Sequence, residues 1–156
     1  MLRAGVDSAV GVTGVAQNVP EADVSVVPFD RAHLSGVLAL FAAEGWSYAD
    51  DAERAWRALT AQGSTCIVAL VDGSVVGVAH VLSDGEIQAF LTVLLVEQAH
   101  RRVGIGARLV RDAFANAGAH RMDLMSCADG FYDALGFQRM SGFRITEGGE
   151  FRQTFR

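Results

Sequence analysis

The sequence contains no lysine, and its 13 basic residues are all arginine. Without lysine the chain can form neither a Schiff base nor a Walker-type phosphate-binding loop, because both depend on that side chain. Acidic residues number 18, and the formal net charge of −5 argues against a nucleic-acid binder, which would present a basic face. No apolar run approaches the roughly 20 residues that cross a bilayer. We therefore expect neither a nucleic-acid nor a membrane partner.

Cysteine is also scarce, with Cys66 and Cys127 as the two examples in 156 residues. Each lies in an apolar run, and neither has the C-x-x-C or Cys/His spacing of a metal site. We interpret both as small buried side chains in a reducing compartment, which predicts a cytoplasmic protein without a bound metal.

Residues 1–21 are rich in glycine, alanine and valine but contain Asp7 and a single arginine, Arg3. This pattern lacks the basic start and the compact apolar stretch of a signal peptide, so we predict a flexible N-terminal tail. Residues 22–156 show no linker or internal repeat. They predict one domain, large enough to fold around its own core without a metal or a disulfide.

Hydrophobic patterning predicts alternating strands and helices. The helices show apolar residues at helical spacing with capping residues at their ends; we expect them from Asp30 to Gly45, at about Tyr48–Ala61, at Gly104–Ala117 and at about Asp129–Leu135. The strands are apolar or β-branched runs bounded by turn residues such as Asp72-Gly73; we expect them at Val24–Val27, Thr65–Val71, Val75–Leu82, Ile87–Val96, Met122–Ser126, Phe137–Ile145 and Phe151–Phe155.

The order of these segments predicts the fold class. Three consecutive strands between residues 65 and 96 are separated by short turns and should form an antiparallel meander. A helix then separates Ile87–Val96 from Met122–Ser126, and such a crossover joins parallel neighbours. The sequence therefore predicts a single α/β domain (an α+β mixed sheet), mainly antiparallel, with flanking helices.

The segment from Arg101 to Ala107 lies between a predicted strand and a predicted helix. Gly104 and Gly106 would let a ligand approach the backbone closely, and a helix start favours an anion such as phosphate. The arginines add positive charge. A dinucleotide-binding fingerprint fits poorly, because Leu109 occupies the position of its third glycine. The segment is typical of a phosphate site, although a simple tight turn would also use these glycines.

Two motifs resemble the GCN5-related N-acetyltransferase (GNAT) family. Arg101, Gly104 and Gly106 fill the family's Gln/Arg-x-x-Gly-x-Gly/Ala pattern. Further along, Phe131-Tyr132-Asp133-Ala134-Leu135-Gly136-Phe137 matches the family's Phe-Tyr-x-x-x-Gly-Phe. The resemblance covers Val24–Ile145. It implies an acetyltransferase that uses acetyl-CoA as its cofactor and releases coenzyme A.

The resemblance also implies where the cofactor lies. The strands Ile87–Val96 and Met122–Ser126 would splay apart, and the backbone of Leu94, Leu95 and Val96 would pair with the pantetheine arm. Arg101 would either contribute to the pyrophosphate cradle or clamp the loop, and Phe131 would pack beneath the cofactor. The backbone N–H groups expected to hold the pyrophosphate belong to Arg102, Val103, Gly104, Ile105, Gly106 and Ala107.

Tyr132 occupies the position of the family's usual general acid. A phenol, with a pKa near 10, can protonate the departing thiolate as the tetrahedral intermediate collapses. A purely packing role is the alternative. Because Phe131 already offers a packing group, we favour the acid role for Tyr132.

The general base is not evident from the motifs. Some relatives have a glutamate within the fourth strand, where this sequence has Phe90. Glu86, acting through water, and Glu44, between the first two helices, are the candidates, and solvation of the surface is the alternative for both. His80 alternates within an apolar strand, so we interpret it as a core histidine. Met125 stands where many relatives have an asparagine, which removes one expected polar contact to the cofactor.

The resemblance implies an acceptor site between the first helices and the fourth strand. Aromatic residues beside carboxylates suit a cationic amine, which predicts a small-molecule or peptide amine as the acceptor. A role in pinning the two helices together is the alternative for two of these aromatics. A homodimer through the terminal strands is a further expectation. The candidate acceptor residues are Trp46, Tyr48, Gln88 and Phe90.

These expectations describe an N-acetyltransferase that moves an acetyl group directly to a primary amine in a ternary complex. Direct transfer follows because no Cys, Ser or Lys lies in a setting that would make it a nucleophile. The alternative is a catalytically inactive, CoA-responsive binding or regulatory module with the same fold.

Overall fold

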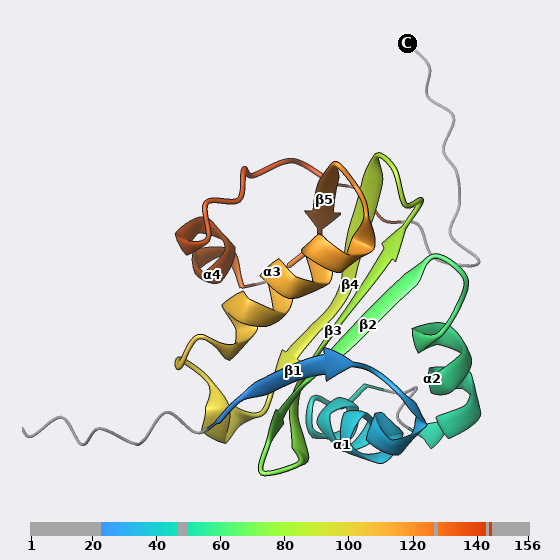
Figure 1. The fold of residues 1–156 in the computed structure, drawn as a ribbon. Helices are drawn as coiled ribbons and strands as arrows, with labels where there is room; N and C mark the ends of the chain where they lie inside the picture. Colours follow the sequence, from blue (N-terminus) through green and yellow to red (C-terminus); the bar gives the residue numbers. More distant parts are fainter. Residues whose placement is uncertain (1–22, 47–49, 127, 143, 145–156) are drawn as a thin grey trace, which may run out of the picture.

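The computed structural model describes residues 23–46, 50–126, 128–142 and 144. Among these residues five strands form one sheet in the order β1-β2-β3-β4-β5 (Figure 1). Neighbours are antiparallel from β1 to β4, whereas β5 runs parallel to β4, which confirms the predicted mixed sheet. The strands are β1 (Ser25–Pro28), β2 (Ser64–Val71), β3 (Ser74–Ser83), β4 (Gln88–Val96) and β5 (Arg121–Leu124).

Capping side chains and glycines set the helix ends. Asp30 and Asp51 each accept a hydrogen bond from a free backbone N–H of the turn that follows, at 2.8 and 2.9 Å. Gly104 and Gly118 flank the longest of the described helices in the left-handed conformation, with φ values of 90° and 68°. The helices are η1 (Arg31–His33), α1 (Leu34–Ala43), α2 (Ala52–Leu59), η3 (Gln98–His100), α3 (Ile105–Ala117) and α4 (Asp129–Ala134).

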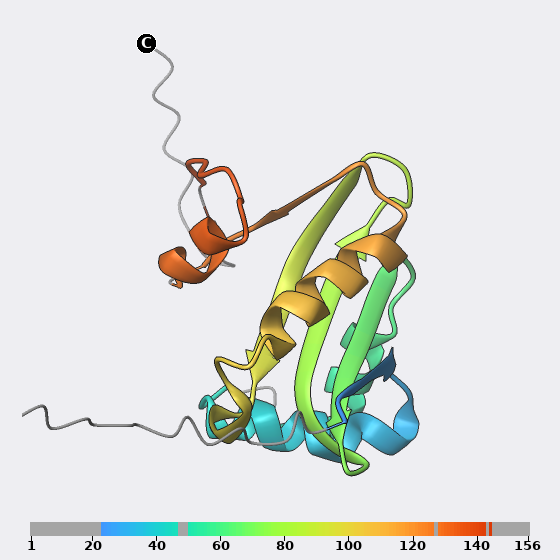
Figure 2. The same ribbon diagram turned by 60° about the vertical axis from the view of Figure 1, so that its left-hand side comes forward.

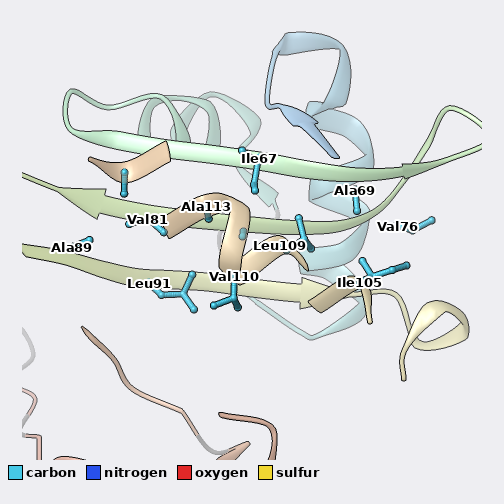
Figure 3. Close-up of a cluster of buried hydrophobic side chains, with 12 residues drawn as sticks. Ile67, Ala69, Val76, Val81, Ala89, Leu91, Ile105, Leu109, Val110 and Ala113 are labelled. Carbon is cyan, nitrogen blue, oxygen red and sulfur yellow. The ribbon is translucent and has the colours of Figure 1, made fainter. Parts of the chain in front are cut away.

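Helices cover both faces of the sheet and bury a hydrophobic core on each. On one face α3 places Leu109 and Ala113 against the strands, where both are fully buried (Figure 3). On the other face α1 and α2 pack around Val37 and Phe41. The large side chains among them, such as Leu109 and Phe41, each contribute roughly 1.5–3 kcal/mol by leaving water. The sheet is therefore held firmly from both sides, apart from its β4–β5 edge.

That edge opens because β5 leaves β4 early. The two strands pair from Gln88 and Arg121 to Leu91 and Leu124, and no pairing with β5 extends to the rest of β4. Figure 2 shows β5 diverging from β4 and leading to α4 away from the sheet. The opening begins at Thr92, where β4 also carries a bulge: His80 pairs with Val93 and the next β3 residue pairs with Leu91. The expected splay is thus present.

One predicted strand is wrong as far as the structure describes it. Residues 137–142 and 144, from the expected strand Phe137–Ile145, form no strand. Instead the segment folds back on α4: the N–H of Phe137 donates to the carbonyl of Tyr132 at 3.1 Å, and Arg139 pairs with Asp129 and Asp133. The segment thus makes its contacts with α4 and not with a neighbouring strand.

Other expectations differ only in their ends or lie outside the described residues. The second helix starts at Ala52, one residue after its Asp51 cap, and β5 ends at Leu124. The tail, residues 1–21, lies outside the described part, as do Tyr48, Cys127 and the expected strand Phe151–Phe155.

Candidate active site

The turn that leads into α3 presents a row of backbone donors. Among the described residues, the N–H groups of residues 102–107 have no hydrogen-bond acceptor, and the first helical bond runs from the N–H of Arg108 to the carbonyl of Gly104 at 3.0 Å. Gly104 has a φ of 90°, and a Cβ built on it would meet nothing within 4 Å. Arg102 also has a positive φ, of 66°. Free donors at a helix start attract anions, so this turn can hold a phosphate.

The open half of β4 lies directly before this turn. Leu94, Leu95 and Val96 pair with β3 along one edge only, opposite Ala79, Val78 and Gly77. Their second edge has no strand partner among the described residues, because β5 has already diverged. An unpaired edge can accept an extended amide-containing ligand as an added strand.

Phe131 joins α4 to the start of α3. A Cβ built on Gly106 would lie 3.3 Å from the ring of Phe131 and 3.7 Å from Val96, so a larger residue there would press on the ring. Phe131 in turn contacts Tyr132 edge-on, with 4.9 Å between ring centroids. The structure thus brings the Phe-Tyr motif, which lies further along the sequence, against the end of β4 and the phosphate-site turn.

Tyr132 lines a pocket of about 510 Å³ that also includes Phe90, Met125 and Ser126. Its ring packs edge-on against Phe137 as well, with centroids 5.6 Å apart. Burial raises the pKa of the Tyr132 phenol above its usual value, while a hydrogen bond with Ser126 acts in the opposite direction. The phenol therefore keeps its proton at neutral pH, as a general acid must.

Arg101 clamps the turn to the rest of the fold. Its Nε donates to the carbonyl of Val96 at 2.8 Å, and its Nη2 lies 2.5 Å from Oε1 of Glu44 at the end of α1. Of the two roles expected for Arg101, this geometry favours the clamp. The same contact engages one carboxylate oxygen of Glu44, the candidate general base, in an ion pair.

Glu86 and Gln88 lie at the opposite end of β4. Gln88 donates to Asp123 at 2.9 Å and accepts from Arg121 at 2.5 Å, so its amide ties β4 to β5. From Gln88 to the opening at Thr92 is already about 13 Å at roughly 3.3 Å per residue, and Glu86 lies further back. The role of Glu86 as a base that reaches the acceptor through water stays a prediction.

The other residues expected at the acceptor site do not lie together in the structure. Phe90 is 38% exposed and shares the pocket of Tyr132. Trp46 stacks on Phe41 of α1, with 5.3 Å between centroids, which agrees with the alternative role of anchoring a helix. Tyr48 lies outside the described residues.

A polar network on β2, β3 and β4 went unnoticed in the sequence. His80 is 5% exposed; its Nδ1 lies 2.5 Å from Oγ1 of Thr92, and its Nε2 lies 3.1 Å from Oγ of Ser64. The core position expected for His80 agrees with this burial. The signal that could have revealed the network is Thr92 itself, the one hydroxyl residue within the apolar run 89–96.

In the part of the chain that the structure describes, no group of three or more His, Cys, Asp or Glu residues could hold a metal ion. Within the same part, no helix is both long and apolar enough to cross a membrane.

The mixed sheet thus opens at its parallel pair, and the turn with free backbone donors and the Phe-Tyr motif lie close to that opening. The sequence matches the family model described as "Acetyltransferase (GNAT) domain" over residues 62–139. The chain therefore belongs to the GNAT acetyltransferase family and is an N-acetyltransferase. None of the curated protein sequences matches it significantly.

Solved structures share the fold. A protein from Deinococcus radiodurans R1 described as an acetyltransferase has a TM-score of 0.68 and 29% identity, covering 80% of this chain and 89% of that one. A GNAT-family acetyltransferase from Streptococcus pneumoniae TIGR4 has a TM-score of 0.65 and 27% identity, covering 79% and 98%. AAC(6')-Iy, in complex with the bisubstrate analogue CoA-S-monomethyl-acetylneamine, has a TM-score of 0.64 at 20% identity, covering 79% and 98%, and is similar in fold alone.

Proposed function

We propose that this enzyme moves an acetyl group from acetyl-CoA to a primary amine by direct transfer in a ternary complex. The observation that carries the proposal is the convergence of three features on one opening: the unpaired edge of Leu94–Val96, the free donors of residues 102–107 and the Tyr132 phenol. The unpaired edge suits the pantetheine arm of coenzyme A, and the free donors suit its pyrophosphate. The phenol suits the departing sulfur.

The residues at the opening fit the coenzyme. The added-strand position along Leu94–Val96 would hold the amides of pantetheine, and the N–H groups from Arg102 to Ala107 would hold the pyrophosphate. Open space at Gly104 leaves these donors accessible, and Phe131 would pack under the arm. AAC(6')-Iy, which shares the fold, is a structural neighbour whose complex contains a CoA-derived bisubstrate analogue. When bound, acetyl-CoA supplies the activated acyl group.

Tyr132 would supply the proton that the leaving sulfur needs. Burial keeps the phenol protonated, and Tyr132 contacts Phe131, whose ring lies next to Gly106. General-acid assistance of this kind is typically worth about 10²–10⁴ in rate.

Direct transfer is supported by the state of the described nucleophiles. Burial raises the pKa of the Cys66 thiol to about 12, so the thiolate that would carry an acyl group is not populated at neutral pH. The chain has no lysine to acylate. A free Cys66 also fits a reducing compartment, and we place the enzyme in the cytoplasm for that reason.

The acceptor would enter beside Phe90, whose exposed ring shares the pocket of Tyr132. Asp123 is paired opposite Phe90 in the sheet and lines the same pocket, and an aromatic face next to a carboxylate attracts a protonated amine. A small-molecule amine or a peptide amine satisfies this chemistry.

The test is an assay of thiol release from acetyl-CoA with a panel of alkylamines, polyamines, aminoglycosides and peptides, with mass spectrometry of the products. Transfer to at least one primary amine is the expected result. Tight acetyl-CoA binding without any acetylated product would overturn the proposal in favour of an inactive CoA-responsive module. Burst kinetics with an acetylated protein would overturn direct transfer alone.

A further inference from the structure

The network around His80 joins the β4–β5 opening to the opposite side of β3. Thr92 lies at one end and is exposed, whereas Ser64 lies at the other end, on β2, and is half-buried. His80 stands between them and is 5% exposed. A buried polar side chain needs hydrogen-bond partners, and Thr92 and Ser64 supply them to His80. The two residues also have a second effect. They connect both ring nitrogens to hydroxyl groups that reach the surface.

Thr92 is placed where the reaction would occur. It follows Leu91, the last β4 residue paired with β5, and it is the extra residue of the bulge. Its position therefore marks the point at which β4 and β5 separate. Phe90, the aromatic residue in the pocket of Tyr132, lies two residues before it on the same strand.

The contacts around His80 permit two complete hydrogen-bond patterns. In the first, Thr92 donates to Nδ1 of His80, Nε2–H donates to Ser64, and Ser64 donates to the carbonyl of Ala58 at 3.5 Å. In the second, Nδ1–H donates to Thr92, which donates to the carbonyl of His80 at 3.1 Å, and Ser64 donates to Nε2. The two patterns differ by one proton shift along the whole chain of atoms. Both leave every hydroxyl and ring nitrogen satisfied.

Among the described residues, the elements around His80 place no charged group on it that would hold a proton on the ring. β3 and β4 contain no other ionisable side chain, nor does α1. On β2 the residue paired with His80 is Cys66, whose thiol stays neutral. The charged residues of α2, namely Glu53, Arg54 and Arg57, are exposed, and Glu53 is paired with Arg31. Burial alone lowers the pKa of His80, so the ring passes a proton on rather than storing it.

We infer that Thr92, His80 and Ser64 form a relay that removes the proton from the acceptor ammonium before it attacks; this rests on the proposed function. One N–H proton of the ammonium passes to Oγ1 of Thr92 as the threonine proton passes to Nδ1 of His80. The Nε2 proton then passes to Ser64, whose own hydroxyl proton goes to water. The amine is left neutral, with its electron pair free. After product release, the reverse shift with water in the site restores the first pattern.

The relay accounts for a reaction in which neither of the two glutamates expected as the base, Glu44 and Glu86, is well placed. Glu44 is ion-paired with Arg101, and Glu86 lies beyond the far end of β4. Thr92 is the group that would touch the amine. His80 and Ser64 act through it.

The first experiment compares Thr92→Val, which keeps the β-branched shape, with Thr65→Val as the matched control. Thr65 lies on β2 and contacts the carbonyl of Asn116 at 3.5 Å, outside the network. The substrates are acetyl-CoA with the best alkylamine of the panel, which is protonated at pH 7, and with benzhydrazide, which is neutral. We expect Thr92→Val to lower kcat/KM for the alkylamine about 10²-fold at pH 7. The loss should shrink as pH rises and be nearly absent with benzhydrazide.

The second experiment needs no acceptor. In the protein without substrate, solvent exchange of the His80 ring proton is followed by NMR; it should slow in Thr92→Val and in Ser64→Ala but not in Thr65→Val. Equal losses with both acceptors at every pH, or unchanged ring-proton exchange, would overturn the relay. If no amine is acetylated by the wild-type enzyme, the proposed function fails, and ring-proton exchange alone decides whether the relay exists.

Discussion

The two halves of β4 share one strand but differ in what their outer edge does. From Gln88 to Leu91 the strand is paired on both sides, and Gln88 further ties it to Arg121 and Asp123 of β5. From Thr92 to Val96 it is paired with β3 alone. The first half holds the sheet closed, and the second leaves backbone groups free for a ligand. The proposed cofactor site therefore lies in the half of β4 that β5 leaves unpaired.

The bulge at Thr92 separates these halves. It also changes which side chains of β4 point to which face of the sheet. Leu91 packs against α3, whereas Val93, two residues later, packs on the α1 face. In an unbroken strand these two side chains would share one face. The extra residue thus reorients the strand at the same point at which β5 leaves. Substitutions in the open half should therefore affect binding and turnover, and those in the closed half should affect stability.

The largest effect is expected at the turn after the open half. Gly104→Glu should abolish measurable acetyl-CoA binding, because its carboxylate would enter the space of the pyrophosphate and repel it. Isothermal titration calorimetry on the folded variant measures this. Gly104→Ala is the control, since it shares the backbone strain at a φ of 90° but adds no charge. Undiminished binding by Gly104→Glu would remove the phosphate site from this turn.

Tyr132→Phe should come next, with kcat lowered by about 10²–10⁴ and acetyl-CoA affinity nearly unchanged. The ring and its packing remain, so the variant isolates the hydroxyl group. Because burial raises the pKa of the phenol, wild-type activity should lose its acid only at a pH above the usual value for tyrosine, and the variant should lack that alkaline limb. Steady-state kinetics across pH measure both. A kcat close to wild type, with chemistry rate-limiting, would leave Tyr132 as a packing residue.

A third comparison concerns stability. Leu91, in the closed half, is 4% exposed and packs in the core under α3, so Leu91→Ala should lower the free energy of unfolding by about 2–5 kcal/mol. Leu94, in the open half, is half-buried, and Leu94→Ala should cost clearly less. Urea denaturation measures the two values. Equal losses would mean that the open half is packed as tightly as the closed one.

The smallest effect is expected for Gln88→Leu. This variant removes the hydrogen bonds to Arg121 and Asp123 and should lower the free energy of unfolding by about 1 kcal/mol while leaving turnover within a few-fold. Denaturation and kinetics are measured on the same preparation. A large rise in KM for the amine would instead indicate that Gln88 contacts the acceptor.

Much of the site could be predicted because its parts are local. The turn at Arg101–Ala107 and the helix after it follow from two glycines and an apolar helical period, and Tyr132 follows from its motif. The expected strand Phe137–Ile145 went wrong for a nonlocal reason. Its apolar residues suit a strand, but in the structure the segment lies against α4, where Arg139 pairs with two carboxylates.

The sequence by itself determined the mixed sheet, the helix caps at Asp30 and Gly104 and the residues of the two motifs, because periodicity, capping and glycine conformation act over a few neighbouring residues. Only the tertiary structure decided that Arg101 clamps Glu44, that Gln88 belongs to the closed end of β4, and that Thr92, His80 and Ser64 meet. Those pairings depend on strand register and on one bulge, which shift side chains between faces and leave no mark in the local pattern.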